Sequence, residues 1–191
     1  MTVIGIGGCM GLIVVGFGLQ DSITAIAKNQ FVNLFTYQAS AVFNGDATEE
    51  KKAQVQSEME TYPGIQQILE MYCQSVELQS PKRSVDAVME VPKDLTHFGD
   101  FFDLRDRVSG KHYDFPAQGA AISEKTADIL GLKVGDTVQM KKGDQIVKVE
   151  ITEIVENYVR HFIYMTTDTY QTLFGEPTEY NQLLLRYEDT S

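Results

Sequence analysis

Residues 120–142, AAISEKTADILGLKVGDTVQMKK, are the stretch that decides the fold. The apolar start of this stretch predicts a short strand, and Ser123 occupies the N-cap position of a helix over residues 124–130. Gly131 ends this helix, because glycine readily adopts the left-handed conformation found at helix C-termini. A turn then leads into a second strand that begins at Thr137. Strands and a short helix in such close succession indicate a mixed α+β domain.

The same mixture continues on both sides of this stretch. Downstream, Lys142-Gly143-Asp144 predicts a tight hairpin, and upstream the alternation of apolar and charged residues over 85–91 predicts a strand with one buried face. The expected strands are 37–43, 68–78, 85–91, 120–122, 137–141, 146–154, 161–165 and 182–187, and the expected helices are 124–130, 166–174 and one that opens on the D-x-x-E signal of Asp46 and Glu49 and runs to about Tyr62. The sequence therefore predicts an α+β fold of small mixed sheets with packed helices over residues 37–191, arranged as one domain or as two subdomains.

The N-terminus is of a different kind. Residues 2–19 carry no charged side chain, whereas all of the 16 basic and 27 acidic residues follow Gln20. As a helix this stretch would span about 27 Å, just short of a ~30 Å hydrocarbon core. Gly7 and Gly11 lie four positions apart, which suits close approach between membrane helices. We therefore expect a transmembrane helix in contact with the lipid bilayer.

Other interpretations of this stretch are weaker. A signal peptide would need basic residues before the apolar run and a small-x-small cleavage site after it. A dinucleotide-binding loop would need glycine at position 10, where the chain has Met10, and a strand before Gly5, where there are only four residues. A buried helix of a soluble protein stays open, although six glycines would destabilise it by about 1 kcal/mol each.

Beyond Gln20 the chain becomes amphipathic. Apolar side chains recur at helical spacing at Ile23, Ile26, Ala27, Phe31, Leu34 and Phe35. We expect one continuous helix that leaves the membrane as a stalk and packs on the domain. Residues 1–36 then form a transmembrane helix and stalk, and residues 37–191 form the domain.

Composition excludes several classes of function. The net charge of −11, with basic residues only in pairs, disfavours a nucleic acid as partner. Cys9 and Cys73 lie too far apart in sequence for a zinc or redox motif. The three histidines have no cysteine nucleophile nearby and no G-x-S-x-G motif to serve, so we expect no catalytic residue, no cofactor and no enzymatic activity.

Residues 92–116 form an excursion with no regular pattern. It interleaves aromatic residues with the carboxylates Asp94, Asp100, Asp103 and Asp106, whose spacing does not match a calcium loop, so we expect no metal site. Phe98, Phe101 and Phe102 are more large apolar side chains than a short irregular segment usually hides. We therefore expect these three residues to contact a partner or substrate. The alternative is that they fill the core of the domain itself.

The chain resembles a known family from end to end. Residues 121–138, the segment Glu156-Asn157-Tyr158-Val159 with Phe162-Ile163-Tyr164-Met165, and Tyr170, Phe174-Gly175 and Asn181 resemble the extracytoplasmic domain of FtsX-like (MacB-type) ABC transporter permeases. The opening, residues 2–8 and 16–23, is similar to the membrane helix that leads into this domain, in particular the second such helix of large permeases from Gram-positive bacteria.

This resemblance implies a division of labour. ATP hydrolysis would occur on a separate cytoplasmic ABC ATPase subunit, in keeping with the lack of a G-x-x-x-x-G-K-[ST] loop in this chain. The protein would lie in the cell membrane beside a second permease copy or half, with residues after about 36 on the extracytoplasmic side. The domain would couple helix motion to export or extraction of a substrate, or to signalling. A working permease needs at least four membrane helices, so we expect the chain to be a fragment.

Two alternatives belong to other classes. A membrane-anchored extracellular binding or sensor domain would show the same single helix and acidic domain. An enzyme domain built on a small barrel would share the Leu-Gly-Leu-Lys-Val-Gly-Asp element, and it would need a pocket with converging polar groups.

Overall fold

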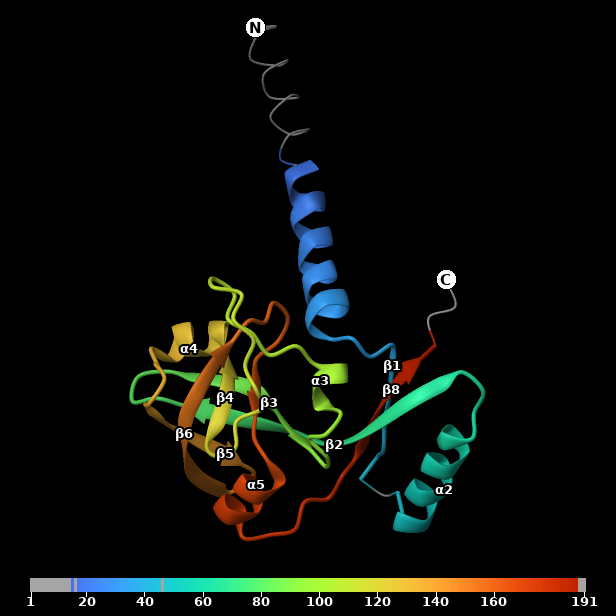
Figure 1. The fold of residues 1–191 in the computed structure, drawn as a ribbon. Helices are drawn as coiled ribbons and strands as arrows, with labels where there is room; N and C mark the ends of the chain where they lie inside the picture. Colours follow the sequence, from blue (N-terminus) through green and yellow to red (C-terminus); the bar gives the residue numbers. More distant parts are fainter. Residues whose placement is uncertain (1–14, 16, 46, 189–191) are drawn as a thin grey trace, which may run out of the picture.

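The computed structural model describes residues 15, 17–45 and 47–188. A helix over residues 17–28 projects from an α+β domain (Figure 1). The elements that follow are the π-helix η1 (Asn29–Leu34), β1 (Ala39–Val42), α2 (Glu49–Glu60), β2 (Ile65–Gln79), β3 (Ser84–Pro92), α3 (Phe98–Phe101), β4 (Ala120–Ser123), α4 (Glu124–Leu130), β5 (Thr137–Lys142), β6 (Gln145–Val155), β7 (Phe162–Tyr164), α5 (Thr167–Phe174) and β8 (Gln182–Tyr187).

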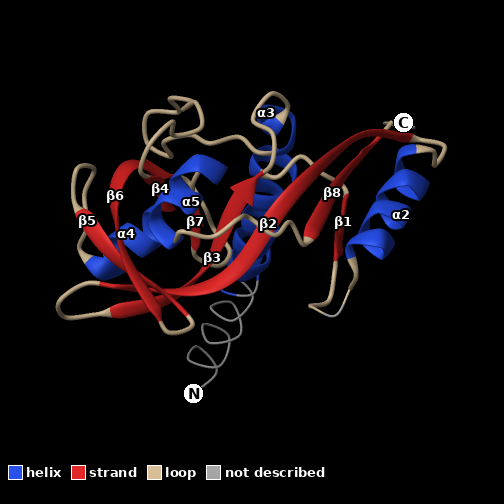
Figure 2. Ribbon diagram, turned by 90° about the horizontal axis from the view of Figure 1, so that it is seen from below, coloured by secondary structure: helices blue, strands red, loops and turns tan. Residues whose placement is uncertain are grey.

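All eight strands join one sheet, in the order β1-β8-β2-β3-β7-β4-β6-β5. The long strand β2 also pairs with β5 through Glu77–Lys141, Leu78–Met140 and Gln79–Gln139, so the strands from β2 to β5 close into a ring. The first part of β2 pairs with β8 instead and carries the sheet out toward α2 (Figure 2). The expected α+β class is confirmed, but the expected set of small sheets is wrong, because β2 is long enough to belong to both parts.

The core inside the closed ring consists mainly of aliphatic side chains and Met. Every second residue of β3, at Ala87, Met89 and Val91, points into it, as the alternation predicts. The other face is not solvent-exposed throughout, since Glu90 is only 6% exposed, so the expectation of a wet second face is wrong at this residue. Ile122 of β4 and Met140 of β5 are fully buried there. Helix α5 contributes Tyr170 and Phe174, and α4 contributes Ala127 and Leu130. We call this set of residues the inner core.

A second core, richer in aromatic side chains, lies outside the ring. It contains Leu34, Phe35, Leu69, Met71, Phe98, Phe101, Phe102, Leu104, Ala121, Val155, Phe162, Tyr164 and Leu184, and we call it the outer core. Phe98, Phe101 and Phe102 are 4%, 0% and 3% exposed. The expectation that they form surplus apolar surface is therefore wrong: rings from the end of the stalk and from β7 pack against them, with Phe35 and Phe102 centred 5.0 Å apart.

Most helix and strand positions agree with the sequence-based prediction, whereas two helix caps differ. Thr48, rather than Asp46, is the N-cap of α2, and its hydroxyl accepts from the N–H of Lys51. Asp46 itself lies outside the described residues. Ser123 does precede α4, but its hydroxyl contacts Thr126 Oγ1 and accepts from the N–H of Phe162. This serine therefore joins strands and helix instead of capping the helix.

The expected transmembrane helix, residues 2–19, falls largely outside the described residues. Among the residues that the structure describes, no helix combines the length and the hydropathy needed to cross a membrane. The stalk packs less than expected, since Ile23, Ile26 and Phe31 are 60%, 41% and 58% exposed. Only its end enters the domain, where Leu34 is 1% exposed.

Candidate functional site at the base of the stalk

The stalk meets the domain through one buried amide side chain. Gln30 in η1 is fully buried, and its Nε2 donates to Asn157 Oδ1 at 2.8 Å. Its Oε1 accepts from the backbone N–H groups of Tyr158 at 2.8 Å and Val159 at 3.1 Å. A single side chain thereby satisfies two backbone donors of the loop between β6 and β7. Since a buried donor without a partner costs about 1–3 kcal/mol, this junction holds one position of the helix on the loop.

The helix widens where Gln30 enters the domain. The N–H of Phe35 bonds to Gln30 O at 2.9 Å, which is the i→i+5 pattern of a π-helix. Short π segments commonly occur at functional sites. The chain is then anchored on α3, because the N–H of Thr36 donates to Phe101 O at 3.0 Å and its hydroxyl donates to Asp100 O at 2.5 Å.

The loop that Gln30 holds is itself braced from within. Asn157 Nδ2 donates to the carbonyls of Val159 at 2.8 Å and Arg160 at 2.9 Å. Arg160 has φ of 65°, and it is the only residue other than glycine with a positive φ among the described residues. Such a conformation is unfavourable for a side chain with a Cβ, so the bonds made by Asn157 and Gln30 hold the loop in a strained state.

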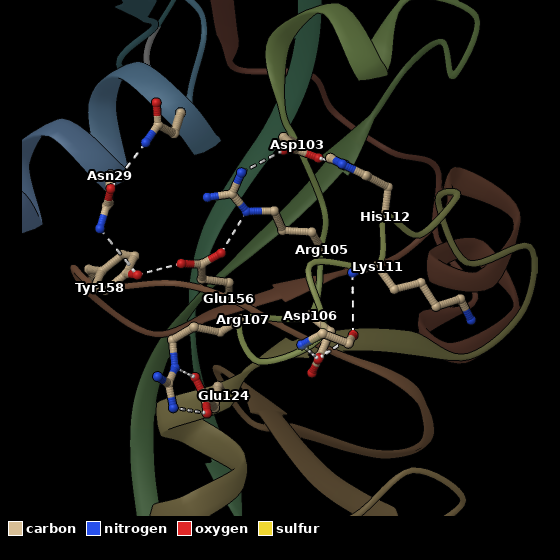
Figure 3. Close-up of polar contacts among 12 residues, drawn as sticks. Asn29, Asp103, Arg105, Asp106, Arg107, Lys111, His112, Glu124, Glu156 and Tyr158 are labelled. Atoms are coloured by element: carbon tan, nitrogen blue, oxygen red, sulfur yellow. Dashed lines mark hydrogen bonds and ion pairs between the residues drawn. The ribbon is translucent and has the colours of Figure 1, made fainter.

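A line of polar side chains continues from the stalk across the domain (Figure 3). Asn29 Nδ2 donates to Tyr158 Oη at 3.3 Å, and this hydroxyl donates to Glu156 Oε1. Glu156 Oε2 in turn accepts from Arg105 Nε at 2.6 Å. The Glu156 side chain is only 6% exposed, so its charge needs the two donors. The stalk is thus connected to the excursion through charged and polar groups.

Ion pairs hold the excursion in place. Arg105 Nη1 also reaches Asp103 Oδ2 at 3.3 Å, and Asp103 Oδ1 lies 2.6 Å from His112 Nδ1. Arg107 makes a two-point contact with Glu124, the first residue of α4, at 2.7 and 3.0 Å. The excursion is therefore fixed at both the stalk side and the α4 side, rather than extended into solvent as a free loop.

Glu156 and Glu124 are the main causes of the pKa shifts in this network. The hydrogen bond to Glu156 is the main cause that raises the pKa of Arg105, and a hydrogen bond to Glu156 likewise raises the pKa of Tyr158. The hydrogen bond to Glu124 raises the pKa of Arg107. Both arginines therefore stay charged and Tyr158 stays neutral at physiological pH.

One carboxyl group in the domain is buried without a charged partner. Glu90 on β3 is 6% exposed, and its Oε2 has no hydrogen-bond partner among the described residues. Burial raises the pKa of Glu90 to about 8. It also raises the pKa values of Cys73, which faces Glu90 across the β2–β3 pairing, and of Tyr37, each to about 12. At neutral pH all three groups are therefore largely protonated.

This arrangement of hydrogen bonds and ion pairs can hold a helix in one orientation on the domain. The described residues contain no group of three or more His, Cys, Asp or Glu side chains placed to hold a metal ion. Each polar side chain from Tyr158 to His112 is hydrogen-bonded to a neighbour in this network. None of these residues is a nucleophile hydrogen-bonded to a general base. Its chemistry is that of a specific, hydrogen-bonded joint.

Sequence reasoning located the wrong residues for this site. It selected the rings of Phe98, Phe101 and Phe102, which the structure buries behind the joint. It did not select Gln30, although an uncharged amide next to the apolar stripe was a signal. Asn157 was part of the motif that carried the family resemblance, but its partner on the stalk lies 127 positions away in sequence.

The fold and the joint define an α+β domain to which a projecting helix is hydrogen-bonded. The family model described as the MacB-like periplasmic core domain matches residues 2–191, and the chain belongs to this family. The family resemblance expected from the sequence is thereby confirmed for the domain, which places it among extracytoplasmic domains of ABC transporter permeases.

Two solved structures are similar to this chain. The extracellular domain of the noncanonic ABC-type transporter YknZ from Gram-positive bacteria matches with a TM-score of 0.50 and 19% identity, over 79% of this chain and 83% of that chain. The periplasmic region of MacB from Actinobacillus actinomycetemcomitans matches with a TM-score of 0.49 and 13% identity, over 87% and 81%. At these identities the likeness concerns the fold alone. No curated protein matches the chain.

Proposed function

We propose that the chain is part of an ABC transporter permease subunit and that its domain couples movement of the stalk helix to export or extraction of a substrate, or to signalling. The domain lies on the extracytoplasmic side of the cell membrane, from about residue 36 onward. The partners are the lipid bilayer around the N-terminal helix, a cytoplasmic ABC ATPase subunit that hydrolyses ATP, and a second permease copy or half. The chain itself is not an enzyme.

The buried Gln30 is the observation that carries this proposal. A helix that only anchored a domain could be joined by a flexible linker, and it would not need a buried amide bonded to two backbone groups. Here a rotation or shift of the helix must either move the 157–160 loop with it or break three hydrogen bonds at 2.8–3.1 Å. Arg105, in the 92–116 excursion, is bonded to Glu156 at the start of the same loop. Movement of the helix would therefore also displace the excursion.

The exposed stalk fits the same role. Its apolar side chains upstream of Gln30 are left uncovered by this domain, including Ile23 and Ile26. Exposed apolar side chains in a row usually mark a surface that another protein or a membrane covers. A neighbouring permease helix and the outer part of the bilayer are the expected occupants.

The test uses the full-length protein, purified from its own host with whatever ATPase subunit accompanies it. Spin labels at positions 23 and 109, introduced as Ile23→Cys and Ser109→Cys in a background with Cys9→Ser and Cys73→Ser, report the distance between stalk and domain. We expect one narrow distance distribution in both the nucleotide-free and the ATP-bound state, because the joint moves as one body. Gln30→Leu should broaden the distance distribution and lower the ATP-driven activity of the transporter. Gln54→Leu on the exposed helix α2 should change neither the distance distribution nor this activity.

Two results would contradict the proposal. If no ABC ATPase accompanies the full-length protein, a membrane-anchored binding or sensor domain is the better assignment. If an ATPase does accompany it but Gln30→Leu leaves the distance distribution unchanged, the joint does not fix the helix, and coupling through Gln30 is wrong.

A further inference from the structure

One cavity in the described part of the chain borders the strained loop at Arg160. It is an open groove of about 780 Å³, a size in the range of sites for small ligands. Its lining comes from β2 and β3, from the hairpin between β5 and β6, and from the 160–161 segment, namely Ser75, Val76, Glu77, Asp86, Ala87, Val88, Lys141, Gly143, Arg160 and His161. Groups of both charges therefore face one groove.

Arg160 is the most unusual of these residues. Each of the other four arginines donates to a carboxylate, an amide oxygen or a carbonyl. Arg160 makes no side-chain hydrogen bond and no ion pair with any described residue, although the chain has 27 acidic residues against 16 basic ones. Burial raises the pKa of Glu90, whose carboxyl group senses the charge of Arg160, to about 8, so at neutral pH this group is largely protonated and does not neutralise the arginine.

The backbone of Arg160 is held in an unfavourable conformation, although its side chain makes no hydrogen bond or ion pair with any described residue. Its φ of 65° is unfavourable, and Asn157 stabilises it by donating to the carbonyls of Val159 and Arg160. Strained conformations that the surroundings enforce cluster at binding and catalytic sites. The strain at Arg160 has no evident structural purpose, since glycine at this position would avoid it.

The acidic side of the groove limits what Arg160 can bind. Glu77 and Asp86 face each other across the β2–β3 pairing, and Lys141 lies opposite Glu77 on β5. Asp86 is exposed and has no hydrogen bond or ion pair with any described residue. A ligand with several negative charges would be repelled by these carboxylates, whereas a ligand with one anionic and one cationic group would be attracted at both ends.

We propose that this groove binds a small zwitterion, with its carboxylate or phosphate on Arg160 and its ammonium group toward Asp86. Arginine provides a planar fork of donors that matches both types of anion. His161, which is half-buried and held by Thr126 Oγ1 at 3.0 Å from its Nδ1, stands next to Arg160 as a second polar group on the same wall. A bound ligand would contact, at Arg160, the loop that Gln30 holds at Tyr158 and Val159.

The test measures binding by calorimetry with the full chain in detergent at low salt. Triglycine is the probe for a carboxylate zwitterion and phosphoethanolamine the probe for a phosphate zwitterion, and the tighter of the two identifies the anion. Arg160→Gly and Arg160→Asn both remove the guanidinium, and glycine and asparagine tolerate a positive φ. We expect each to weaken binding at least about tenfold, since a charge-assisted contact is lost, without lowering the melting temperature.

Two further variants separate this site from general charge effects. Asp86→Asn should weaken binding of the zwitterion and strengthen binding of inorganic phosphate, because it removes the ammonium partner and the repulsion together. Lys82→Gln removes one positive charge at the exposed β2–β3 turn, outside the groove, and should change affinity less than about twofold. The proposal is overturned if neither probe binds, if both Arg160 variants bind as the parent does, or if Lys82→Gln weakens binding as much as they do.

Discussion

The inner core and the outer core are both closed to solvent, yet they are built on different principles. The inner core is filled by aliphatic side chains and Met from strands that pair with one another, together with two aromatic residues of α5. The outer core is richer in aromatic side chains, and it is assembled from segments far apart in sequence, including the end of the stalk, α3, β7 and β8. Buried polar groups border it, notably Gln30 and Glu90.

The difference indicates different tasks. A uniform apolar core stabilises a fold and tolerates conservative exchange, because its contacts have no direction. Buried hydrogen bonds add little net stability, but a misplaced partner is costly, so they select one arrangement. The inner core therefore supplies stability to the sheet, and the outer core and its border position the stalk helix on that sheet.

The largest expected effect tests whether the two cores act separately. Phe101→Ala in the outer core should lower the free energy of unfolding by about 3–5 kcal/mol, and Ile122→Ala in the inner core by about 2–5 kcal/mol. Only Phe101→Ala should also speed hydrogen exchange at residues 30–36, because the Phe101 ring packs in the same core as Leu34 and Phe35 at the end of the stalk. Equal acceleration by Ile122→Ala would mean that the cores unfold as one unit.

The next effect concerns the buried carboxyl group at the outer core. Burial raises the pKa of Glu90 from 4.5 to about 8, so between these values the folded protein binds more protons than the unfolded chain. Stability should therefore fall as the pH rises from about 4.5 to about 8. Glu90→Gln should remove this decline and stabilise the protein at pH 9 by several kcal/mol, because each unit of pKa difference corresponds to about 1.4 kcal/mol. Denaturant titrations at pH 5, 7 and 9 measure the effect.

The control for this prediction is Glu150→Gln, an exposed carboxylate on β6. It should leave the pH dependence of the parent unchanged. If Glu90→Gln shows the same decline with pH as the parent, the proton on Glu90 does not control the stability of the outer core, and other groups must account for any decline observed.

The smallest expected effect compares two glycines at the rim of the closed ring. Gly119 has φ of 66°, and a Cβ there would lie 2.7 Å from Glu150 O and 2.7 Å from Thr152 Cγ2. Gly143 has φ of 57° in the β5–β6 hairpin, with nothing within 4 Å. Alanine should cost about 1 kcal/mol at Gly143 and about 2–3 kcal/mol at Gly119, where overpacking adds to the strain. Melting temperatures of the two variants show which substitution is more destabilising. If alanine at Gly143 costs more than at Gly119, β6 near residues 150 and 152 moves aside with little cost.

Local sequence patterns were enough to predict the strands and helices of the domain. Period-two alternation identified β3, the Lys142-Gly143-Asp144 turn identified the β5–β6 hairpin, and Gly131 identified the end of α4. These signals depend on residues close together in sequence, where backbone geometry and burial of one face determine the conformation. The family, too, could be recognised from the order of such motifs.

Pairing between distant strands could not be predicted in this way. The closed ring depends on β2 reaching β5, and the sequence gives no indication of which strands meet when sequence separation is large. The excursion shows the same difficulty on a smaller scale. Three phenylalanines in an irregular segment are compatible with an exposed patch or with a core. They are buried here because Phe35 and Phe162, from distant parts of the chain, pack in the same cluster of rings.

The sequence by itself determined the strands, the helices, the acidic surface and the membership of a membrane-transporter family. Only the tertiary structure decided that Gln30 joins the stalk to the 157–160 loop and that Arg160 faces an open groove without a partner. The physical reason is that secondary structure follows from short-range sterics and periodic burial, whereas a functional contact between distant residues depends on how the whole chain packs. The partner of a buried amide is chosen by that packing and leaves no local pattern.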